Sequence, residues 1–322
     1  MASQTPSLGM TLGSVYIGAT IAAILFGITN LQAVIYYNKY PDDWWIYRYS
    51  VAILWTFDAL HVALGTHALY HYFIDLFGEY TVLYNIVWSF KLQILFNMVI
   101  ILGVQGVYTF RIWKRGRHFH RILPWFVVLN VVVALGTGIF SVYDAYSISS
   151  FLSIPSIKAS ICSVFVMAAI SDFIIAFSMC YYLHKGREAS AFSSTSAMIL
   201  GLMRLVVISG LATSACSLLT LITYLAWPDS LIFLGIDFIL PKLYINSLLA
   251  MLNSRRDRHA SSNSGNSTTK VLRFAPRDSG TDTEEVNISI PMQSFQSLDH
   301  DKDGPGFRNW VLIAAAAVGV IR

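Results

Sequence analysis

Seven apolar stretches, each long enough to cross a lipid bilayer, follow one another between Leu12 and Leu252. A hydrocarbon core about 30 Å thick requires roughly 20 apolar residues in a helix that rises about 1.5 Å per residue. In lipid, only helices and closed barrels satisfy their own backbone hydrogen bonds. We therefore predict an all-α fold, a bundle of seven transmembrane helices. The predicted spans are Leu12–Tyr37, Ile46–Tyr70, Leu83–Arg111, Ile122–Tyr143, Ile157–Leu183, Ala197–Ala226 and Ser230–Leu252.

Composition supports a single membrane domain. Only 12% of the 322 residues are charged, whereas a soluble globular chain has about 25%. We divide the chain into a short leader at 1–11, the membrane domain at 12–252 and a tail at 253–322. The tail begins with the low-complexity run HASSNSGNSTTK, so we expect it to be disordered, and its apolar run at 311–321 is too short to span a bilayer. The pattern of charge indicates no nucleic-acid partner, and three cysteines within apolar stretches indicate no disulfide framework.

Lysine and arginine are concentrated in alternate loops. Twelve of them fall on one face of the predicted bundle, whereas one, Lys158, falls on the other. Short cytoplasmic loops of membrane proteins carry such an excess. We therefore expect the leader outside the cell and the tail in the cytoplasm, and we assign the protein to the plasma membrane. The basic face comprises Lys39, Arg48, Arg111, Lys114, Arg115, Arg117, Arg121, Lys185, Arg187, Arg255, Arg256 and Arg258.

Six Asp, Lys and Arg side chains fall deep within the predicted spans. Each costs about 2.5–3.5 kcal/mol at the centre of a helix in lipid, so all six are expected to face the bundle interior or water. Lys91 and Asp237 lie at the same predicted depth in the membrane, so they are expected to form an ion pair. Lys242 lies at the same depth as Asp58 and Asp172 and is expected to pair with one of them. The groups are either structural ion pairs or part of a path for a substrate or ion. The six are Asp58, Lys91, Asp172, Arg204, Asp237 and Lys242.

The second predicted helix adds histidines. Asp58 and His61 stand three residues apart on one helical face, and we expect them to be hydrogen-bonded. His67 and His71 have a spacing that can chelate a metal, and Asp75 continues their row. The seventh predicted helix contains no histidine, however, and a zinc site of the membrane-hydrolase type needs ligands from distant helices. We therefore predict no metal and no cofactor.

The last predicted span places polar groups on one helical stripe. Lys242 and Asn246 lie on this stripe. Leu249 and Asn253 continue it. Pro241 directly precedes Lys242 and removes one backbone hydrogen bond of the helix, so we expect a kink there. Such a kink suits a hinge or a binding site, although prolines also occur in membrane helices without such a role. The candidate binding residues of the bundle interior are Asp58, His61, Lys91, Asp172, Asp237, Lys242 and Asn246.

The seventh span also carries a longer motif. The run PKLYINSLLAMLNSR at Pro241–Arg255 resembles the closing motif of an uncharacterised family of seven-helix membrane proteins from fungi of basidiomycete type, defined by a domain of unknown function. Runs similar to the family's first two helices and the turn between them, GATIAAILFGITNLQAVIYY, YPDDWW and ALHVALGTHALYHY, occur within Gly18–Tyr72. The resemblance covers about residues 10–255. It implies a multi-pass membrane protein without an assigned activity, and no functional residue is carried over from it.

The topology favours a receptor-like or sensory protein and not an enzyme. An outside leader, a basic cytoplasmic face and a tail that bears Ser and Thr are typical of such receptors. A transporter or channel that uses the buried Asp and Lys groups is the alternative, although such proteins usually show two matching halves and no internal repeat is visible in this sequence. An intramembrane metal hydrolase is the third hypothesis. The expected partners are the lipid bilayer and a cytoplasmic protein at the basic loops and tail, while the ligand is not specified.

Overall fold

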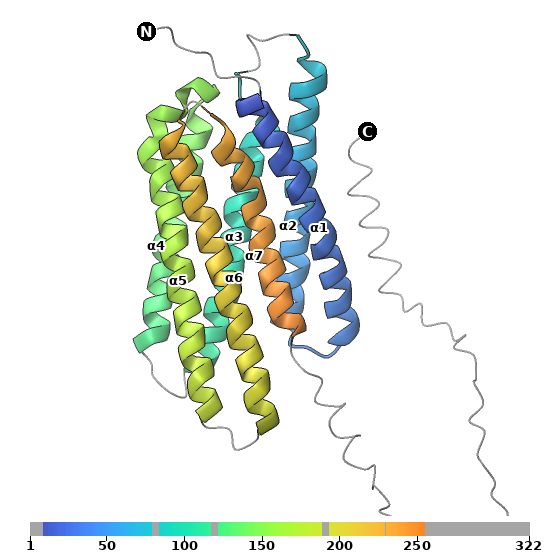
Figure 1. Ribbon diagram of the computed structural model, residues 1–322, viewed down its shortest axis with the longest axis vertical. Coiled ribbons are helices and arrows are strands. Elements are labelled where there is room, and N and C mark those ends of the chain that lie inside the picture. The colour runs from blue at the N-terminus through green and yellow to red at the C-terminus, as the bar shows by residue number, and fades with distance from the viewer. Residues whose placement is uncertain (1–8, 79–83, 117–121, 189–192, 229, 255–322) are drawn as a thin grey trace, which may run out of the picture. The chain divides into compact units, whose positions relative to one another are not determined.

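The computed structural model describes residues 9–78, 84–116, 122–188, 193–228 and 230–254. Within these ranges, seven helices are long and apolar enough to cross a membrane (Figure 1), and no β-strand is formed. The prediction of an all-α fold with seven candidate membrane helices is therefore confirmed. Most of the predicted leader and tail, with the apolar run at 311–321, lies outside the described residues. The helices are α1 (Ser14–Lys39), α2 (Trp45–Tyr70), α3 (Trp88–Gly116), α4 (Ile122–Ser147), α5 (Lys158–Glu188), α6 (Ser193–Ala226) and α7 (Ile232–Asn253).

Short helical segments extend three of these helices. One leads into α1, one continues α2, and one leads into α5, where the hydroxyl of Ser150 accepts a 3.3 Å hydrogen bond from the N–H of Leu152. α5 and α6 run past the predicted spans, to Glu188 and from Ser193. Hydropathy marks only the part of a helix that crosses lipid, whereas helical hydrogen bonding continues into polar residues. The segments are η1 (Gly9–Gly13), η2 (His71–Asp75) and η3 (Phe151–Ile157).

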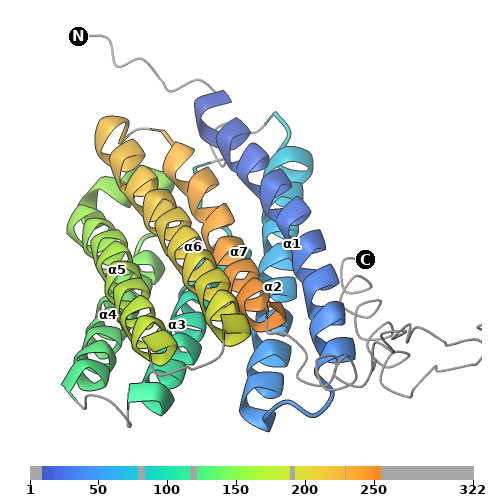
Figure 2. The ribbon, with the colours of Figure 1, turned by 60° about the horizontal axis from the view of Figure 1, so that its bottom comes forward.

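α7 occupies the middle of the bundle. It packs between α1 and α6 and also contacts α2 and α3 (Figures 1 and 2). Buried residues make up 61% of its apolar stretch, compared with 22% for α1. On α1 and α4, large apolar side chains point outward; Ile24 is 64% exposed and Leu129 is 61% exposed. A helix that is buried on all sides belongs in a core, whereas an exposed apolar face suits contact with lipid.

α1 and α7 approach each other at a pair of glycines. A Cβ atom added to Gly18 would collide with the backbone of Gly235. One added to Gly235 would collide with the backbone of Ser14. Small residues let membrane helices come close together, because no side chain separates the two backbones. The pair therefore sets the distance between α1 and the central helix at this end of the bundle.

Two asparagines of α7 bind α1 along the rest of its length. The side-chain amide of Asn246 donates to the carbonyl of Leu25 at 3.1 Å. Asn253 donates in the same way to the carbonyl of Gln32 at 2.9 Å. The second contact lies about two helical turns beyond the first on both helices. The hydroxyl of Tyr40 then donates to the carbonyl of Asn253 at 3.2 Å, which fastens the end of α1.

The segments before α3 and after α4 pair at one end of the bundle. Asn85 and Ser150 form an isolated antiparallel bridge. The N–H of Phe151 donates to the carbonyl of Tyr84 at 2.8 Å, and the hydroxyl of Tyr72 donates to the carbonyl of Asn85 at the same distance. These bonds hold η3 in place at the end where α3, α5 and α7 begin.

Candidate functional site

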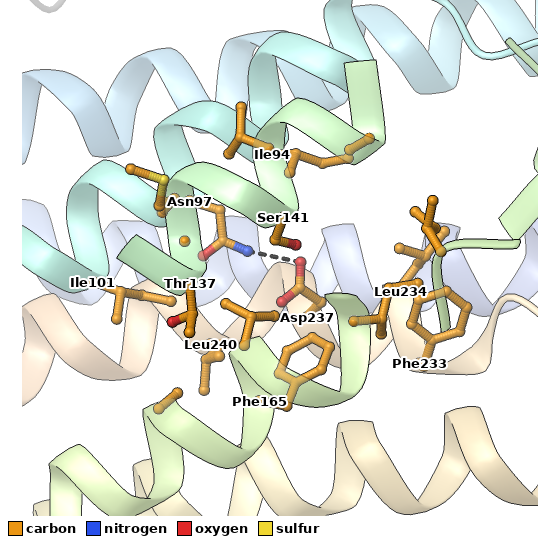
Figure 3. Close-up of a pocket in the computed structure, with 18 of the residues that line it drawn as sticks. Ile94, Asn97, Ile101, Thr137, Ser141, Phe165, Phe233, Leu234, Asp237 and Leu240 are labelled. Atoms are coloured by element: carbon orange, nitrogen blue, oxygen red, sulfur yellow. Dashed lines mark hydrogen bonds between the residues drawn. The ribbon is translucent and has the colours of Figure 1, made fainter. Parts of the chain in front are cut away.

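A cavity of about 140 Å³ lies between α3, α4, α5 and α7 (Figure 3). Its walls are mainly aliphatic and aromatic, and Phe151 and Ile154 of η3 line it at the end where α5 begins. An apolar cavity of about 150 Å³ engineered into another protein binds benzene, whereas a water molecule needs only about 10–15 Å³. The space is therefore sufficient for a small organic molecule.

One polar corner interrupts these apolar walls. Oδ2 of Asp237, on α7, accepts a 2.7 Å hydrogen bond from the side-chain amide of Asn97, on α3. Ser141 of α4 lies beside the same corner (Figure 3), whereas the hydroxyl of Thr137 points away from Asp237 and donates to the carbonyl of Ala134 at 2.9 Å. Asn97 is buried, and its Oδ1 has no hydrogen-bond partner. An apolar pocket with a few convergent polar groups is the usual form of a site for a small molecule.

The pair predicted between Lys91 and Asp237 is not formed. Nζ of Lys91 donates instead to the carbonyls of Tyr146, at 3.0 Å, and Ile148, at 2.7 Å. The last carbonyls of a helix lack partners within it, and a lysine satisfies them and suits the negative end of the helix dipole. Lys91 therefore fastens α3 to the C-terminal end of α4. Asp237 forms no ion pair within the described part of the chain.

Lys242 and Asp58 form an ion pair, which is one of the two alternatives predicted for this lysine. Both side chains are fully buried. The ammonium group also donates to the backbone carbonyl of Asp58 at 3.1 Å and lies 5.5 Å from the centre of the Phe26 ring. The amide of Asn246 donates to the carbonyl of Lys242 at 2.9 Å. Groups from α1, α2 and α7 therefore surround this charge.

The hydrogen bond predicted between His61 and Asp58 is not formed. His61 is 2% exposed, and its Nε2 has no hydrogen-bond partner. Its ring meets the ring of Phe238 edge to face, with centroids 6.0 Å apart. Oδ2 of Asp58 is also buried without a partner. A buried polar atom without a hydrogen bond costs about 1–3 kcal/mol, so this cluster is held by its ion pair and not by a complete hydrogen-bond network.

Asp172 takes a different partner from the one considered for it. Its Oδ2 accepts a 2.8 Å hydrogen bond from the hydroxyl of Tyr244, so it does not pair with Lys242. A small cavity of about 20 Å³, with room for about one water molecule, is lined by both Asp172 and Tyr244. Gln105 of α3 lines this small cavity and the large one, and its buried Oε1 has no hydrogen-bond partner. The two cavities therefore share one side chain.

The histidines of α2 and η2 are not gathered at one site. Nδ1 of His67 lies 3.0 Å from the hydroxyl of Ser89, and Nδ1 of His71 lies 3.1 Å from Oδ2 of Asp75. Across the described ranges, no group of three or more His, Cys, Asp or Glu side chains is placed to hold a metal ion. His67 therefore contacts the start of α3, whereas His71 contacts another residue of η2.

The seven predicted binding residues occupy four separate places in the bundle. Three further side chains that contact them or line the cavities were not predicted. Asn97, Gln105 and Tyr244 are uncharged, so a search based on charge does not find them. A signal exists for two of them, because Gln93, Asn97 and Gln105 recur at multiples of four residues along α3. All three are buried. This spacing keeps side chains on one helical face and marks the face of α3 that turns inward.

Residues 168–257 match DUF6534, a family of unknown function. The matched segment covers most of α5 and all of α6 and α7, so it includes Asp172, Asp237 and Lys242. Comparison with curated proteins and with solved structures found no match. Together with the apolar helices, the family match agrees with a membrane protein of unknown activity. Because no activity is assigned to that family, the match names no ligand for the cavity.

Proposed function

We propose that this chain is a receptor-like membrane protein that binds a small, largely apolar ligand between α3, α4, α5 and α7. The observation that supports this function is the cavity: apolar walls line about 140 Å³, and Asp237 and Asn97 form one polar corner. Pockets of this composition bury most of a ligand's surface and orient it with few polar groups. Because such a ligand touches four helices, its binding changes their packing, which is how a receptor passes on a signal.

The charge asymmetry supports a direction for that signal. We place the N-terminus outside, the tail in the cytoplasm and the protein in the plasma membrane. The cavity then lies toward the outside, since η3 and Phe233 at the start of α7 line it. Basic side chains at the opposite end, among them Lys39 and Lys185, then face a cytoplasmic protein partner. The fungal origin that the sequence motifs imply is part of this proposal.

A transporter or channel is the second candidate, because a fully buried ion pair lies at mid-depth in the bundle. Lys242 and Asp58 are both inaccessible to solvent. We favour the receptor because contacts from three helices enclose this pair, whereas an ion path requires charged groups that exchange partners. We infer no enzymatic activity. A metal hydrolase has the least support, since His67 contacts Ser89 on α3 while His71 contacts Asp75 on η2, so the two histidines face different partners.

Binding of a neutral apolar probe tests the proposed function. Full-length protein in lipid nanodiscs is titrated with cyclohexylmethanol, and binding is followed as a rise in melting temperature. We expect saturable stabilisation of the wild type and its loss in Ala134→Leu, which fills part of the cavity. Gly27→Leu adds bulk on α1 where nothing lies within 4 Å of the added Cβ, so it should retain binding. Equal, unsaturable shifts in all three proteins would contradict the proposal.

Ion flux separates the receptor from the transporter. The protein is reconstituted in vesicles that contain dyes for H⁺, Na⁺ and K⁺. If the protein is a receptor, we expect no ion flux above that of protein-free vesicles. Flux that stops in Asp58→Asn would support the transporter instead, because the buried ion pair would then belong to the path.

A further inference from the structure

Asp237 brings a carboxylate without a counter-charge to the large cavity. It lines the cavity (Figure 3), and its hydrogen bond within the described residues is the one from Asn97 at 2.7 Å. The lysines inside the bundle are engaged elsewhere: Lys242 pairs with Asp58, and Lys91 donates to carbonyls at the end of α4. A half-buried charge among apolar walls is unfavourable without a partner, so the corner suits a cation supplied by a ligand.

We propose that the ligand is a small lipophilic amine whose ammonium group pairs with Asp237 while its hydrocarbon body contacts the apolar walls. This inference rests on the proposed function, since it names the class of ligand that the cavity takes. An ammonium group has several N–H donors and no acceptor. The corner supplies matching acceptors, because the Asp237 carboxylate and the hydroxyl oxygen of Ser141 lie side by side there (Figure 3).

Asn97 positions the carboxylate for this contact. Its amide donates to Oδ2 of Asp237, which leaves the other carboxylate oxygen for a ligand. Asn97 is 6% exposed and therefore held by its surroundings on α3. A charged hydrogen bond in an apolar cavity is stronger than the same bond in water. The amide thus orients the carboxylate while adding no positive charge that would compete with an ammonium group.

The remaining walls select an apolar body. Ile101 and Leu240 flank the corner, and the rings of Phe165 and Phe233 face the same space (Figure 3). A cavity of about 150 Å³ accommodates a molecule of the size of benzene, so a single ring with a short aminomethyl group has a suitable size. An anionic ligand is excluded, since its charge would meet the carboxylate of Asp237.

A proton is the other means of neutralising this half-buried carboxylate. A protonated Asp237 would be a neutral donor and acceptor, and it would bind an alcohol as well as an amine. A deprotonated Asp237 pairs with an ammonium group and discriminates against the alcohol. Comparison of an amine with an alcohol of the same shape therefore decides between the two states.

Three probes with the same ring and different head groups test the inference. Cyclohexylmethylamine, cyclohexylmethanol and cyclohexanecarboxylate are titrated into full-length protein in phosphatidylcholine nanodiscs, and dissociation constants are measured from melting temperatures. We expect the amine to bind about tenfold or more tightly than the alcohol, and the carboxylate not to bind. In Asp237→Asn, the amine and alcohol should bind within about threefold of each other. Asp172→Asn removes a buried carboxylate elsewhere and should keep the tenfold preference.

Each outcome decides a different question. Equal affinity of amine and alcohol for the wild type would overturn the inference and leave the proposed function standing. Absence of binding by all three probes would overturn both. A preference for the amine that survives in Asp237→Asn would also overturn the inference. If that variant does not fold, Asp237→Ser replaces it, and an amine preference that survives in Asp237→Ser overturns the inference in the same way.

Discussion

Lys242 shows how strongly one buried side chain constrains this bundle. It is fully buried beside Asp58, with no access to water. Removing one partner of a buried ion pair costs about 3–5 kcal/mol, because the other charge remains unpaired. A side-chain hydrogen bond between membrane helices contributes only about 0.6 kcal/mol on average. Loss of one partner of this pair is therefore expected to cost more than loss of a single bond such as that of Asn246 to α1.

A charge-removal series tests this balance. We expect Lys242→Met to lower the free energy of unfolding by about 3–5 kcal/mol, since Asp58 is then buried without a counter-charge. Lys242→Met combined with Asp58→Leu is expected to recover most of that loss, because no charge remains to be paired. Unfolding in mixed micelles with increasing SDS, followed by circular dichroism, measures both. A double variant no more stable than the single one would show that the charge is not the source of the cost.

Lys91 is expected to be energetically independent of Asp237. Lys91→Met removes two hydrogen bonds to the end of α4 and should cost about 1–3 kcal/mol. Since the two side chains do not meet, the effects of Lys91→Met and Asp237→Asn should add to within about 0.5 kcal/mol. A double-mutant cycle on unfolding free energies measures the sum. A coupling energy well above about 0.5 kcal/mol would instead support the ion pair between Lys91 and Asp237 that their equal depth in the membrane suggested.

The inward direction of these charged groups was predictable, but most of their partners were not. Hydropathy places Asp58, Asp237 and Lys242 within the membrane, and the cost of a charge in lipid turns them inward. Which groups meet depends on the rotation of each helix and on its place in the bundle. Asn97 donates a hydrogen bond to Asp237, but it is uncharged and therefore does not appear in the charge pattern. Depth along a helix alone therefore suggested a wrong partner for Lys91.

At the scale of the element, α7 shows why the most specific motif of the sequence lies in one helix. The segment Pro241–Arg255 contains the lysine that pairs with α2 and the two asparagines that bind α1. It also contains Tyr244, which donates to Asp172 on α5. A central helix meets a different neighbour on each face, so packing constrains nearly every position. The lysine and asparagine stripe was readable from the sequence, whereas the role of Tyr244 required the structure.

The contact between α1 and α7 is expected to depend on Gly18 more than on Gly27. Gly18→Ala places a methyl group where the backbone of Gly235 lies, and overpacking of this kind costs about 1–3 kcal/mol. Gly27 faces open space, so Gly27→Ala should be neutral or gain up to about 1 kcal/mol from helix propensity. The melting temperatures of the two variants are compared in the same nanodiscs. Equal shifts would mean that the two helices are not held together by this glycine pair.

At the scale of the whole molecule, the cavity is a property that appears only on assembly. Its walls come from four helices and η3, and residues as distant in sequence as Phe90 and Asp237 line it together. In the sequence, each apolar wall residue is indistinguishable from one that faces lipid. Helix class and the number of spans depend on local hydropathy, so they were predictable from the sequence. The space between packed helices depends on how side chains from several of them interlock, so it was not.

The orientation of the whole bundle is the last expectation open to test. Twelve Lys and Arg residues lie on one face of the predicted topology and one on the other. We therefore expect an N-terminal epitope tag to be labelled on intact cells and a C-terminal tag only after permeabilisation. The excess is spread over several loops, so Lys39→Ala alone should not change the result, which makes it a suitable control. Labelling of the C-terminal tag alone on intact cells would invert the bundle, and the Asp237 cavity would then receive its ligand from the cytoplasm.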